Sequence, residues 1–367
     1  MLYIIARSKA VVLFLMLISG TSFHSIAGTP FGFRVIGYYC GTTIPIDSFE
    51  TEKLTHLIFS FGNLRENHFA INSATDSATI KRMVELKSKN PGMKVMLSLG
   101  GWGGCATCSD VFSTSSGRKE FAQSIKEISS FFKTDGIDLD WEYPAIKGFP
   151  EHTFRPEDRS NFTLLLKELR EVNGPEFEIS FAAGGFTSYI DSSVEWKEII
   201  KYVNFINIMS YDLVHGYSTT SGHHTPLYST TKQTESTDHA VQLLLMLGVP
   251  AKKLVIGAAF YGRFFQIKEG NEVDLHKPCK FLHGFSYKYS SDSLSAENGF
   301  EKKWDEVAMA PYAVNLKRRL VATYDDEKSI ALKTKYAVAN KLGGIMFWQL
   351  YDDKFHGGLL DVLYRNK

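Results

Sequence analysis

The stretch DGIDLDWEYP, residues 135–144, places four carboxylates among residues that otherwise favour a buried β-strand. Side chains alternate across a strand, so Asp138, Asp140 and Glu142 point to the same side, and Asp135 lies one turn earlier. Crowding and loss of water must raise the pKa of at least one of these carboxyl groups. A carboxyl group that keeps its proton near neutral pH can act as a general acid. The stretch therefore predicts catalytic carboxylates carried to the end of a strand.

These acids have two other possible explanations. Acids at the end of a strand can be held by ion pairs, or they can bind a metal ion such as calcium. Ligands confined to one face of one strand give poor geometry for calcium, which takes six to eight oxygen ligands around it. The catalytic interpretation is therefore favoured over both alternatives.

Seven further runs of apolar, β-branched or aromatic residues resemble the strand at 136–141. They are RVIGYY (34–39), HLIFSF (56–61), KVMLSL (94–99), EISFAA (178–183), FINIMS (205–210), LVIGAAF (254–260) and GIMFW (344–348). Amphipathic helix patterns with apolar residues at i, i+3 and i+4 lie between several of them, at 77–89, 117–133 and 159–172. Strand and helix alternating eight times predict a (β/α)8 TIM barrel. An open doubly wound sheet competes, but GYYCGTT (37–43) is not its glycine-rich phosphate loop.

The segment between the seventh and eighth predicted strands is unusually long and spans 264–322. Its length predicts a small α+β subdomain inserted into a βα loop, and an ordinary long loop with one helix is the alternative. Although the chain has 367 residues, barrels of this kind reach about 250 residues or more as one domain. We therefore expect one catalytic barrel over 28–367 that carries the insertion.

The overall composition excludes several classes of partner. The net charge is +1 and no long run of one sign occurs, so neither a nucleic acid nor an anionic membrane is indicated. His223 and His224 come closest to a metal motif. Adjacent histidines on a loop point apart and lack a third ligand at motif spacing, so a loop role near the site is favoured. No metal and no cofactor are predicted.

The N-terminal residues have the pattern of a secretory signal peptide. Arg7 and Lys9 precede the apolar run AVVLFLMLIS (10–19), and the small-x-small pattern Ser-Ile-Ala (25–27) precedes Gly28. The apolar run is short for a membrane span. We expect cleavage after Ala27 and a soluble, secreted mature protein, with an uncleaved anchor as the alternative.

Export would allow disulfides between the four cysteines. Cys105 and Cys108 could form a redox motif or half a zinc site, but no second CxxC follows. A local structural disulfide is therefore favoured. Cys40 and Cys279 are too far apart in sequence for their pairing to be assigned.

The acidic stretch resembles the DxxDxDxE signature of family 18 glycoside hydrolases, the chitinase family. Four other motifs resemble those of the same family, and the likeness covers essentially all of the mature chain. They are SLGGW (98–102), MSYD (209–212), YGR (261–263) and GGIMFWQLYDD (343–353). Some family members also carry an α+β subdomain after the seventh strand that walls the substrate groove. The resemblance thus implies the same barrel and the same insertion.

The resemblance also implies a mechanism in which the substrate's own acetamido oxygen attacks the anomeric carbon. Glu142 would protonate the leaving oxygen and later activate water. Asp140 would orient the acetamido group, and Asp138 would share a proton with it, so that the two titrate together. Tyr211 would donate its hydroxyl to the acetamido oxygen. Asp135 would be structural support.

Further residues would line the sugar groove by the same resemblance. Trp348 would form the floor under the distorted sugar, and Trp102 would stack on the leaving-group side. Packing is the alternative for Trp348, Tyr38 and Tyr261. The complete expected set is Tyr38, Phe61, Gly101, Trp102, Tyr143, Met209, Asp212, Tyr217, Tyr261, Arg263 and Trp348.

The sequence departs from the family pattern after the sixth strand. Family members often read YDLxGxW, whereas this chain reads YDLVHGYS (211–218), with His215 in place of a glycine and Tyr217 in place of the tryptophan. Stacking on the leaving-group side should then be weaker or shaped for another ligand.

Three functions remain in competition. The favoured one is a secreted, monomeric, endo-acting chitinase that binds chitin or another N-acetylglucosamine glycan. An endo-β-N-acetylglucosaminidase acting on glycoproteins would use the same chemistry, so the motif does not exclude it. A non-catalytic lectin on the same barrel typically lacks the acid, and Glu142 is present here.

Overall fold

The computed structural model describes residues 32–41 and 46–367. The predicted signal peptide (1–27) lies outside the described residues. Within the described ranges, no helix combines the length and the apolar character needed to cross a membrane.

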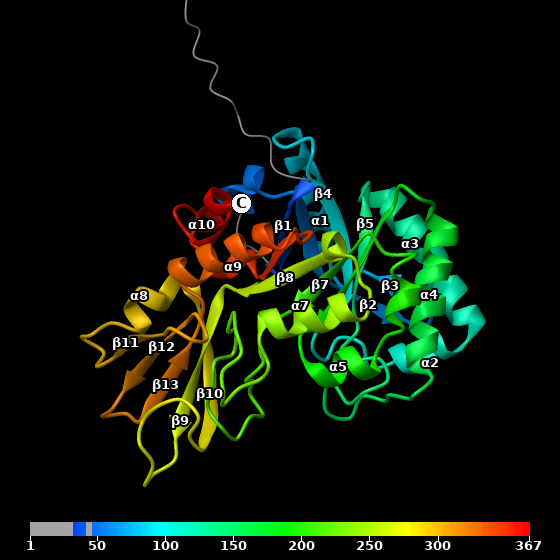
Figure 1. The fold of residues 1–367 in the computed structure, drawn as a ribbon. Coiled ribbons are helices and arrows are strands. Elements are labelled where there is room, and N and C mark those ends of the chain that lie inside the picture. Colours follow the sequence, from blue (N-terminus) through cyan, green and yellow to red (C-terminus); the bar gives the residue numbers. More distant parts are fainter. Residues whose placement is uncertain (1–31, 42–45) are drawn as a thin grey trace, which may run out of the picture. The chain divides into compact units, whose positions relative to one another are not determined.

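Eight parallel strands form a closed barrel (Figure 1). They are β1 (Arg34–Tyr39), β2 (His56–Arg65), β4 (Lys94–Gly100), β5 (Gly136–Asp140), β6 (Glu178–Gly184), β7 (Phe205–Met209), β8 (Leu254–Ala259) and β14 (Gly344–Trp348). Each strand pairs with the next, and β14 pairs back to β1, which closes the ring. The predicted barrel is confirmed. Only β2 is clearly longer than expected, because it continues into a hairpin with β3 (His68–Ala70).

Helices cover the outside of the barrel, and their ends follow local capping signals (Figure 1). The predicted helix at 77–89 begins earlier, because the Ser73 side chain accepts a hydrogen bond from the Asp76 backbone N–H. Thr114 caps the next long helix in the same way, at the backbone N–H of Gly117. The helices around the barrel are α1 (Ala74–Glu85), α2 (Cys108–Ser113), α3 (Ser115–Phe132), α4 (Asp158–Asn173), α5 (Thr187–Ser192), α6 (Trp196–Ile199), α7 (Thr237–Met246), α9 (Glu327–Ala339) and α10 (Leu359–Asn366). Short 3-10 helices occupy Ile46–Ser48, Thr51–Lys53, Leu86–Ser88, Ala251–Lys253, Tyr287–Tyr289 and Leu350–Asp352.

A five-stranded antiparallel sheet lies between β8 and α9 in the chain (Figure 1). Its strands are β9 (Tyr261–Ile267), β10 (Cys279–Ser286), β11 (Glu301–Asp305), β12 (Ala310–Asn315) and β13 (Leu320–Thr323), and α8 (Ser290–Ser293) follows β10. The order across the sheet is β10-β9-β13-β12-β11. Two small apolar clusters are built from its residues, one around Phe264 and one around Phe265. Because adjacent residues of a strand face opposite ways, both faces of this sheet are covered.

Two separate apolar clusters hold the barrel together. The larger one packs the strands against the helices and includes Leu97 of β4, Leu139 of β5 and Phe121 of α3. The smaller one fills the inside of the barrel and includes Tyr38 and Tyr211. A barrel of eight strands is just wide enough for side chains to fill it, so the polar groups of a site must gather where the strands end.

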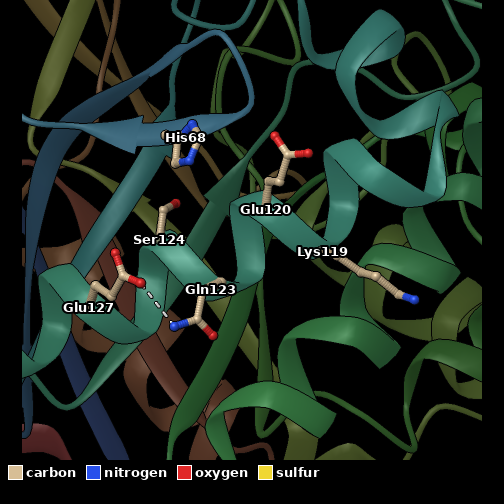
Figure 2. Close-up of a pocket in the computed structure, with 6 residues that line it drawn as sticks. All are labelled: His68, Lys119, Glu120, Gln123, Ser124 and Glu127. Atoms are coloured by element: carbon tan, nitrogen blue, oxygen red, sulfur yellow. Dashed lines mark hydrogen bonds between the residues drawn. The ribbon is translucent and has the colours of Figure 1, made fainter.

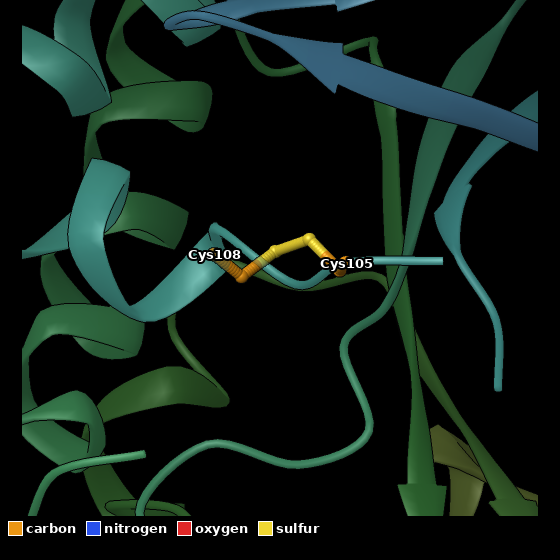
Figure 3. The surroundings of a disulfide bond; sticks show 2 residues. All are labelled: Cys105 and Cys108. Atoms are coloured by element: carbon orange, nitrogen blue, oxygen red, sulfur yellow. A yellow bond between two sulfur atoms is a disulfide. The ribbon is translucent and has the colours of Figure 1, made fainter. Parts of the chain in front are cut away.

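The predicted local disulfide is confirmed. Cys105 and Cys108 are bonded, with 5.3 Å between their Cα atoms, in the turn that leads into α2 (Figure 3). Cys40 is exposed, Cys279 is buried, and neither forms a disulfide.

A buried ion pair joins α9 to the barrel. Lys333 Nζ lies 2.7 Å from Asp325 Oδ2, and both side chains are fully buried. The ammonium also donates to the Thr225 carbonyl at 2.8 Å, and the backbone N–H of Ala259 donates to Asp325 Oδ2 at 3.0 Å. The pair therefore connects α9, the segment after β7 and the end of β8.

We expect Lys333→Met to lower the free energy of unfolding by about 3–5 kcal/mol, because it leaves the Asp325 carboxylate buried without a countercharge. Urea-induced unfolding followed by circular dichroism measures this loss. Lys201→Met is the control. Lys201 pairs with Glu198 in an exposed contact, and such pairs contribute at most about 1 kcal/mol. Equal losses in the two variants would contradict the prediction.

Candidate active site

The predicted acids lie where β5 reaches the carboxyl end of the barrel. Asp138 and Asp140 are buried, and Glu142 follows two residues beyond the strand and is half-buried. The turn after β4 lies beside them, since the backbone N–H of Gly101 donates to the Asp140 carbonyl at 2.9 Å. Strand alternation thus places Asp138 and Asp140 on the same side of β5, and Glu142 lies beyond the end of the strand.

Asp138 is held by four hydrogen-bond donors from four different strands. Tyr38 Oη and Ser98 Oγ donate to its Oδ2 at 3.0 and 2.9 Å. Ser180 Oγ and Asn207 Nδ2 donate to its Oδ1 at 2.6 and 3.2 Å. Burial raises the pKa of Asp138, and these four hydrogen bonds oppose the rise. Of the three acids, Asp138 is therefore the one whose negative charge is best compensated by hydrogen-bond donors.

Asp140 has the opposite environment. Its Oδ1 atom is buried and has no hydrogen-bond partner among the described residues. Burial raises the pKa of Asp140 well above its usual range, and the neighbouring charges of Glu142 and Asp138 raise it further. The carboxyl group therefore holds its proton more tightly than a free aspartic acid does, and it has an unused acceptor atom inside the site.

Glu142 is poised to give up or take a proton near neutral pH. Burial raises its pKa to about 7, and the negative charge of Asp212 adds to the rise, whereas a hydrogen bond from Tyr143 opposes it. A group with such a pKa can serve both as a general acid and as a general base.

Tyr211 follows β7 and points into the barrel's inner cluster. Its hydroxyl donates only to the Met346 sulfur among the described residues, at 3.7 Å. A thioether is a weak acceptor, so the hydroxyl can donate to a better acceptor placed in the site. Burial raises the pKa of Tyr211 well above its usual range, and the nearby acids Asp140 and Glu142 raise it further.

Asp212 is bound by two residues of the inserted sheet. Arg263 Nε donates to Asp212 Oδ1 at 2.6 Å, and Tyr261 Oη donates to the same atom at 2.7 Å. Burial by itself would raise the pKa of Asp212, but hydrogen bonds from His224 and Arg263 hold it below its usual range. The structure therefore places Tyr261 and Arg263 on β9 as partners of Asp212.

Trp348 ends β14 and is half-buried. Its ring stacks on Phe61 with a centroid distance of 5.5 Å and an interplanar angle of 13°, and the Tyr38 ring lies 6.0 Å from it. Gly101 lies under Phe61, where an added Cβ would come within 2.4 Å of the ring. Gly101 therefore admits Phe61 to the site because it has no side chain.

Two exposed aromatic side chains stand at the rim of the site. Trp102 is 48% exposed and Tyr217 is 62% exposed, and their ring centroids are 6.3 Å apart. Trp102 also contacts Tyr143 at 6.4 Å and Phe149 at 5.5 Å. Sequence analysis did not identify Phe149. The planes of the Trp102 and Tyr217 rings are inclined by 51°, so the two rings offer adjacent exposed apolar faces at the rim.

The remaining predicted residues divide between the site and its support. Met209 is buried in the inner cluster beside Tyr38 and Tyr211. Asp135 lies before the amino end of β5, where Lys87 Nζ donates to it at 2.8 Å and the backbone N–H of Val95 at 2.8 Å. Asp135 therefore joins neighbouring segments of the barrel away from the other acids.

Sequence analysis missed three partners of Asp138, namely Ser98, Ser180 and Asn207. Polar side chains within otherwise apolar runs, such as Asn207 in FINIM, were the available signal.

The two histidines, His223 and His224, are buried and point apart. His224 Nδ1 lies 3.5 Å from Asp212 Oδ1, and His223 Nε2 lies 3.1 Å from Asp305 Oδ2. The described ranges contain no group of three side chains that could hold a metal ion.

The hollows in the described part of the chain include one beside the site and one away from it. One of about 260 Å³ adjoins Trp348 and is walled by the inserted sheet; its lining is Tyr261, Gly284, Phe285, Ser286, Trp348 and Asp352. Another of about 290 Å³ lies between the β2–β3 hairpin and α3 (Figure 2). Its lining is His68, Lys119, Glu120, Gln123, Ser124 and Glu127, none of them predicted as a site residue. The first hollow therefore extends the candidate site.

Comparison with known proteins places this barrel and its carboxylates in a family. The model of Glycosyl hydrolases family 18 matches residues 34–353. The chain belongs to this family. Chitinase A1 from Niallia circulans is 33% identical over 304 residues, which cover 76% of this chain and 43% of that protein. Probable chitinase 2 from Drosophila melanogaster is 32% identical over 346 residues, which cover 85% of this chain and 69% of that protein.

A solved family 18 structure has the same fold over its whole length. The N-acetylglucosaminidase from Paenibacillus barengoltzii is 34% identical, with a TM-score of 0.81, and the match covers 91% of this chain and 100% of that one. By contrast, the match spans less than half of chitinase A1. The family 18 membership expected from DGIDLDWEYP is thus confirmed.

Proposed function

We propose that this chain is a secreted family 18 hydrolase that cleaves β-1,4 bonds between N-acetylglucosamine units of chitin or chito-oligosaccharides. The different environments of the three acids at the end of β5 carry the proposal. Asp138 is compensated by four donors, Asp140 has a free acceptor atom, and Glu142 has a pKa of about 7. The similarity to chitinase A1 supports chitin as the substrate.

The first step of the proposed reaction breaks the bond between the anomeric carbon and the leaving oxygen. Glu142 gives its proton to that oxygen, which keeps the electron pair of the broken bond. The acetamido oxygen of the same sugar forms the new bond to the anomeric carbon, and an oxazolinium ion results. Water then attacks the anomeric carbon and breaks its bond to the acetamido oxygen, which takes back the electron pair, while the Glu142 carboxylate takes the water's proton. Because the anomeric carbon is displaced twice, the product retains its configuration.

Asp140 and Tyr211 orient the attacking group in this proposal. The unpartnered Oδ1 atom of Asp140 accepts the acetamido N–H, and the Tyr211 hydroxyl donates to the acetamido oxygen. Asp140 shares its proton with Asp138, so it can become negative as positive charge develops on the ring. Trp348 lies under the reacting sugar, and Trp102 and Tyr217 contact the leaving part of the chain.

We further propose that residues 1–27 are removed on secretion and that the mature protein, 28–367, acts as a monomer. Its barrel would carry an α+β subdomain over 264–322. The site would have no metal and no cofactor, because the substrate's acetamido group supplies the nucleophile. Cleavage inside the chain is the favoured mode.

The pH dependence of the reaction follows from the raised pKa of Glu142. Because the acid must be protonated in the free enzyme, kcat/KM on a chito-oligosaccharide should fall as the pH rises through about 7. Asp212→Asn removes a negative charge that raises this pKa, so its alkaline limb should move to lower pH. A profile that stays flat to high pH would contradict the prediction.

Product analysis tests the function itself. The secreted protein is incubated with N-acetylglucosamine tetramers and hexamers and, separately, with a high-mannose glycoprotein. Dimers and trimers released from the oligomers support an endo-acting chitinase. Release of single sugars from a chain end would contradict endo action and would indicate N-acetylglucosaminidase activity, which is named for the Paenibacillus relative. Deglycosylation of the protein alone would assign another glycan, and no cleavage of either would favour the lectin.

A further inference from the structure

Two adjacent histidines form matched contacts with two different aspartates. His224 Nδ1 lies 3.5 Å from Asp212 Oδ1 in the candidate site. His223 Nε2 lies 3.1 Å from Asp305 Oδ2 of the inserted sheet. Both side chains are almost completely buried. The pair therefore places one imidazole beside the site and the other between the barrel and the insertion.

The imidazole of His224 is unusual because its Nε2 atom has no hydrogen-bond partner among the described residues and its Nδ1 atom has only a long contact with Asp212. Its contact with Asp212, at 3.5 Å, is at the limit of a hydrogen bond. The Tyr261 ring packs against it with a centroid distance of 5.2 Å. Buried polar groups without partners are rare in folded proteins, and each calls for an explanation.

The charges around His224 determine what its ring can do. Asp212 and Arg263 lie on the side of the site, and Asp325, paired with Lys333, lies beyond. Burial lowers the pKa of His224, although a hydrogen bond to Asp212 opposes this. The ring is thus neutral near pH 7, with one donor nitrogen and one acceptor nitrogen. Only a proton on Nδ1 lets the ring donate to the Asp212 carboxylate.

We propose that His224 is a positioning residue that acts through Asp212 on the acid Glu142. The inference deepens the proposed function and rests on it. The Nδ1–H of His224 adds a donor to a carboxylate already held by Arg263 and Tyr261. This donor fixes the rotation of the Asp212 carboxylate and favours its charged form. The charge of Asp212 in turn helps keep Glu142 protonated.

Two substitutions of His224 distinguish the roles of its two ring nitrogens. The amide nitrogen of asparagine takes about the place of Nδ1, and that of glutamine takes about the place of Nε2. We therefore expect His224→Asn to keep kcat/KM on a chito-oligosaccharide close to wild type. His224→Gln should lower kcat/KM about tenfold, which is the size of effect found for coupled neighbours. The same variant should move the alkaline limb of the pH profile to lower pH.

A double-mutant cycle tests whether His224 acts through Asp212. In an Asp212→Asn background, His224→Gln should cause no further loss of kcat/KM, because the carboxylate it positions is gone. His223→Gln is the matched control and should leave the alkaline limb unchanged in both backgrounds. Equal effects of asparagine and glutamine at position 224, or full additivity with Asp212→Asn, would overturn the proposal.

A measurement without turnover keeps this test separate from the test of function. Nitrogen NMR of the histidine rings should find His224 neutral with its proton on Nδ1, and the signal should change in Asp212→Asn. A proton on Nε2 in the wild type would overturn the proposal even if the enzyme is active. Wild-type protein that cleaves no glycan would instead overturn the proposed function.

Discussion

Glu142→Gln should lower kcat on chito-oligosaccharides by about 10²–10⁴-fold, the share of the rate that a general acid usually supplies. Glutamine has nearly the same shape as glutamate but has no proton to give to the leaving oxygen. The aromatic side chains that would contact the sugars remain in place. Binding of an uncleaved oligomer, measured by calorimetry, should therefore change little while kcat falls.

Glu195→Gln provides the matched control for this variant. Glu195 is also half-buried, and its carboxylate accepts a hydrogen bond from Thr163 at 2.7 Å outside the site. This variant should keep wild-type kcat. If Glu142→Gln also keeps it, Glu142 is not the acid and the proposed mechanism fails.

Asp140→Asn should lower kcat by about 10²–10³-fold, the range typical for loss of one electrostatic stabiliser. The amide can still contact the acetamido group, but it cannot become negative as positive charge develops on the sugar. Steady-state kinetics on the same oligomers measures the loss. A wild-type kcat in this variant would contradict the proposed role of Asp140.

The same variant should not destabilise the fold. The pKa of Asp140 is raised in the folded state by burial, Glu142 and Asp138, so its carboxyl group destabilises the fold at any pH above its unfolded pKa. Asp140→Asn should thus keep or raise the melting temperature at pH 7, with no gain below about pH 4. Asp135→Asn should show the opposite pattern, with wild-type kcat and a lower melting temperature, because it loses the Lys87 ion pair.

The family and the grouping of the acids were predictable because their signals are local in the chain. Asp138 and Asp140 lie at alternate positions of β5, and this spacing places them on one side of the strand, whereas Glu142 lies two residues beyond its end. The eight strands were equally readable, since each is a short apolar run between helical patterns. The Cys105–Cys108 disulfide was also local, because only three positions separate the two residues.

The long-range contacts of the site were not predictable from the sequence. Tyr261 and Arg263 were expected to line the groove, but their hydrogen bonds to Asp212, 49 and 51 positions away, were not foreseen. The adjacent histidines were expected on a loop near the site. Nothing in their spacing indicated that one of them contacts Asp212 and the other Asp305.

The sequence by itself thus determined the barrel, the family and the clustering of the three acids at one strand, because strand alternation and the motif depend on neighbours in the chain. Only the tertiary structure decided how these acids differ. Asp138 accepts hydrogen bonds from four strands, whereas Asp140 keeps an unpartnered oxygen. The pKa of a buried carboxyl group depends on the donors, charges and water around it. Those neighbours come from distant parts of the chain and meet only when the barrel closes.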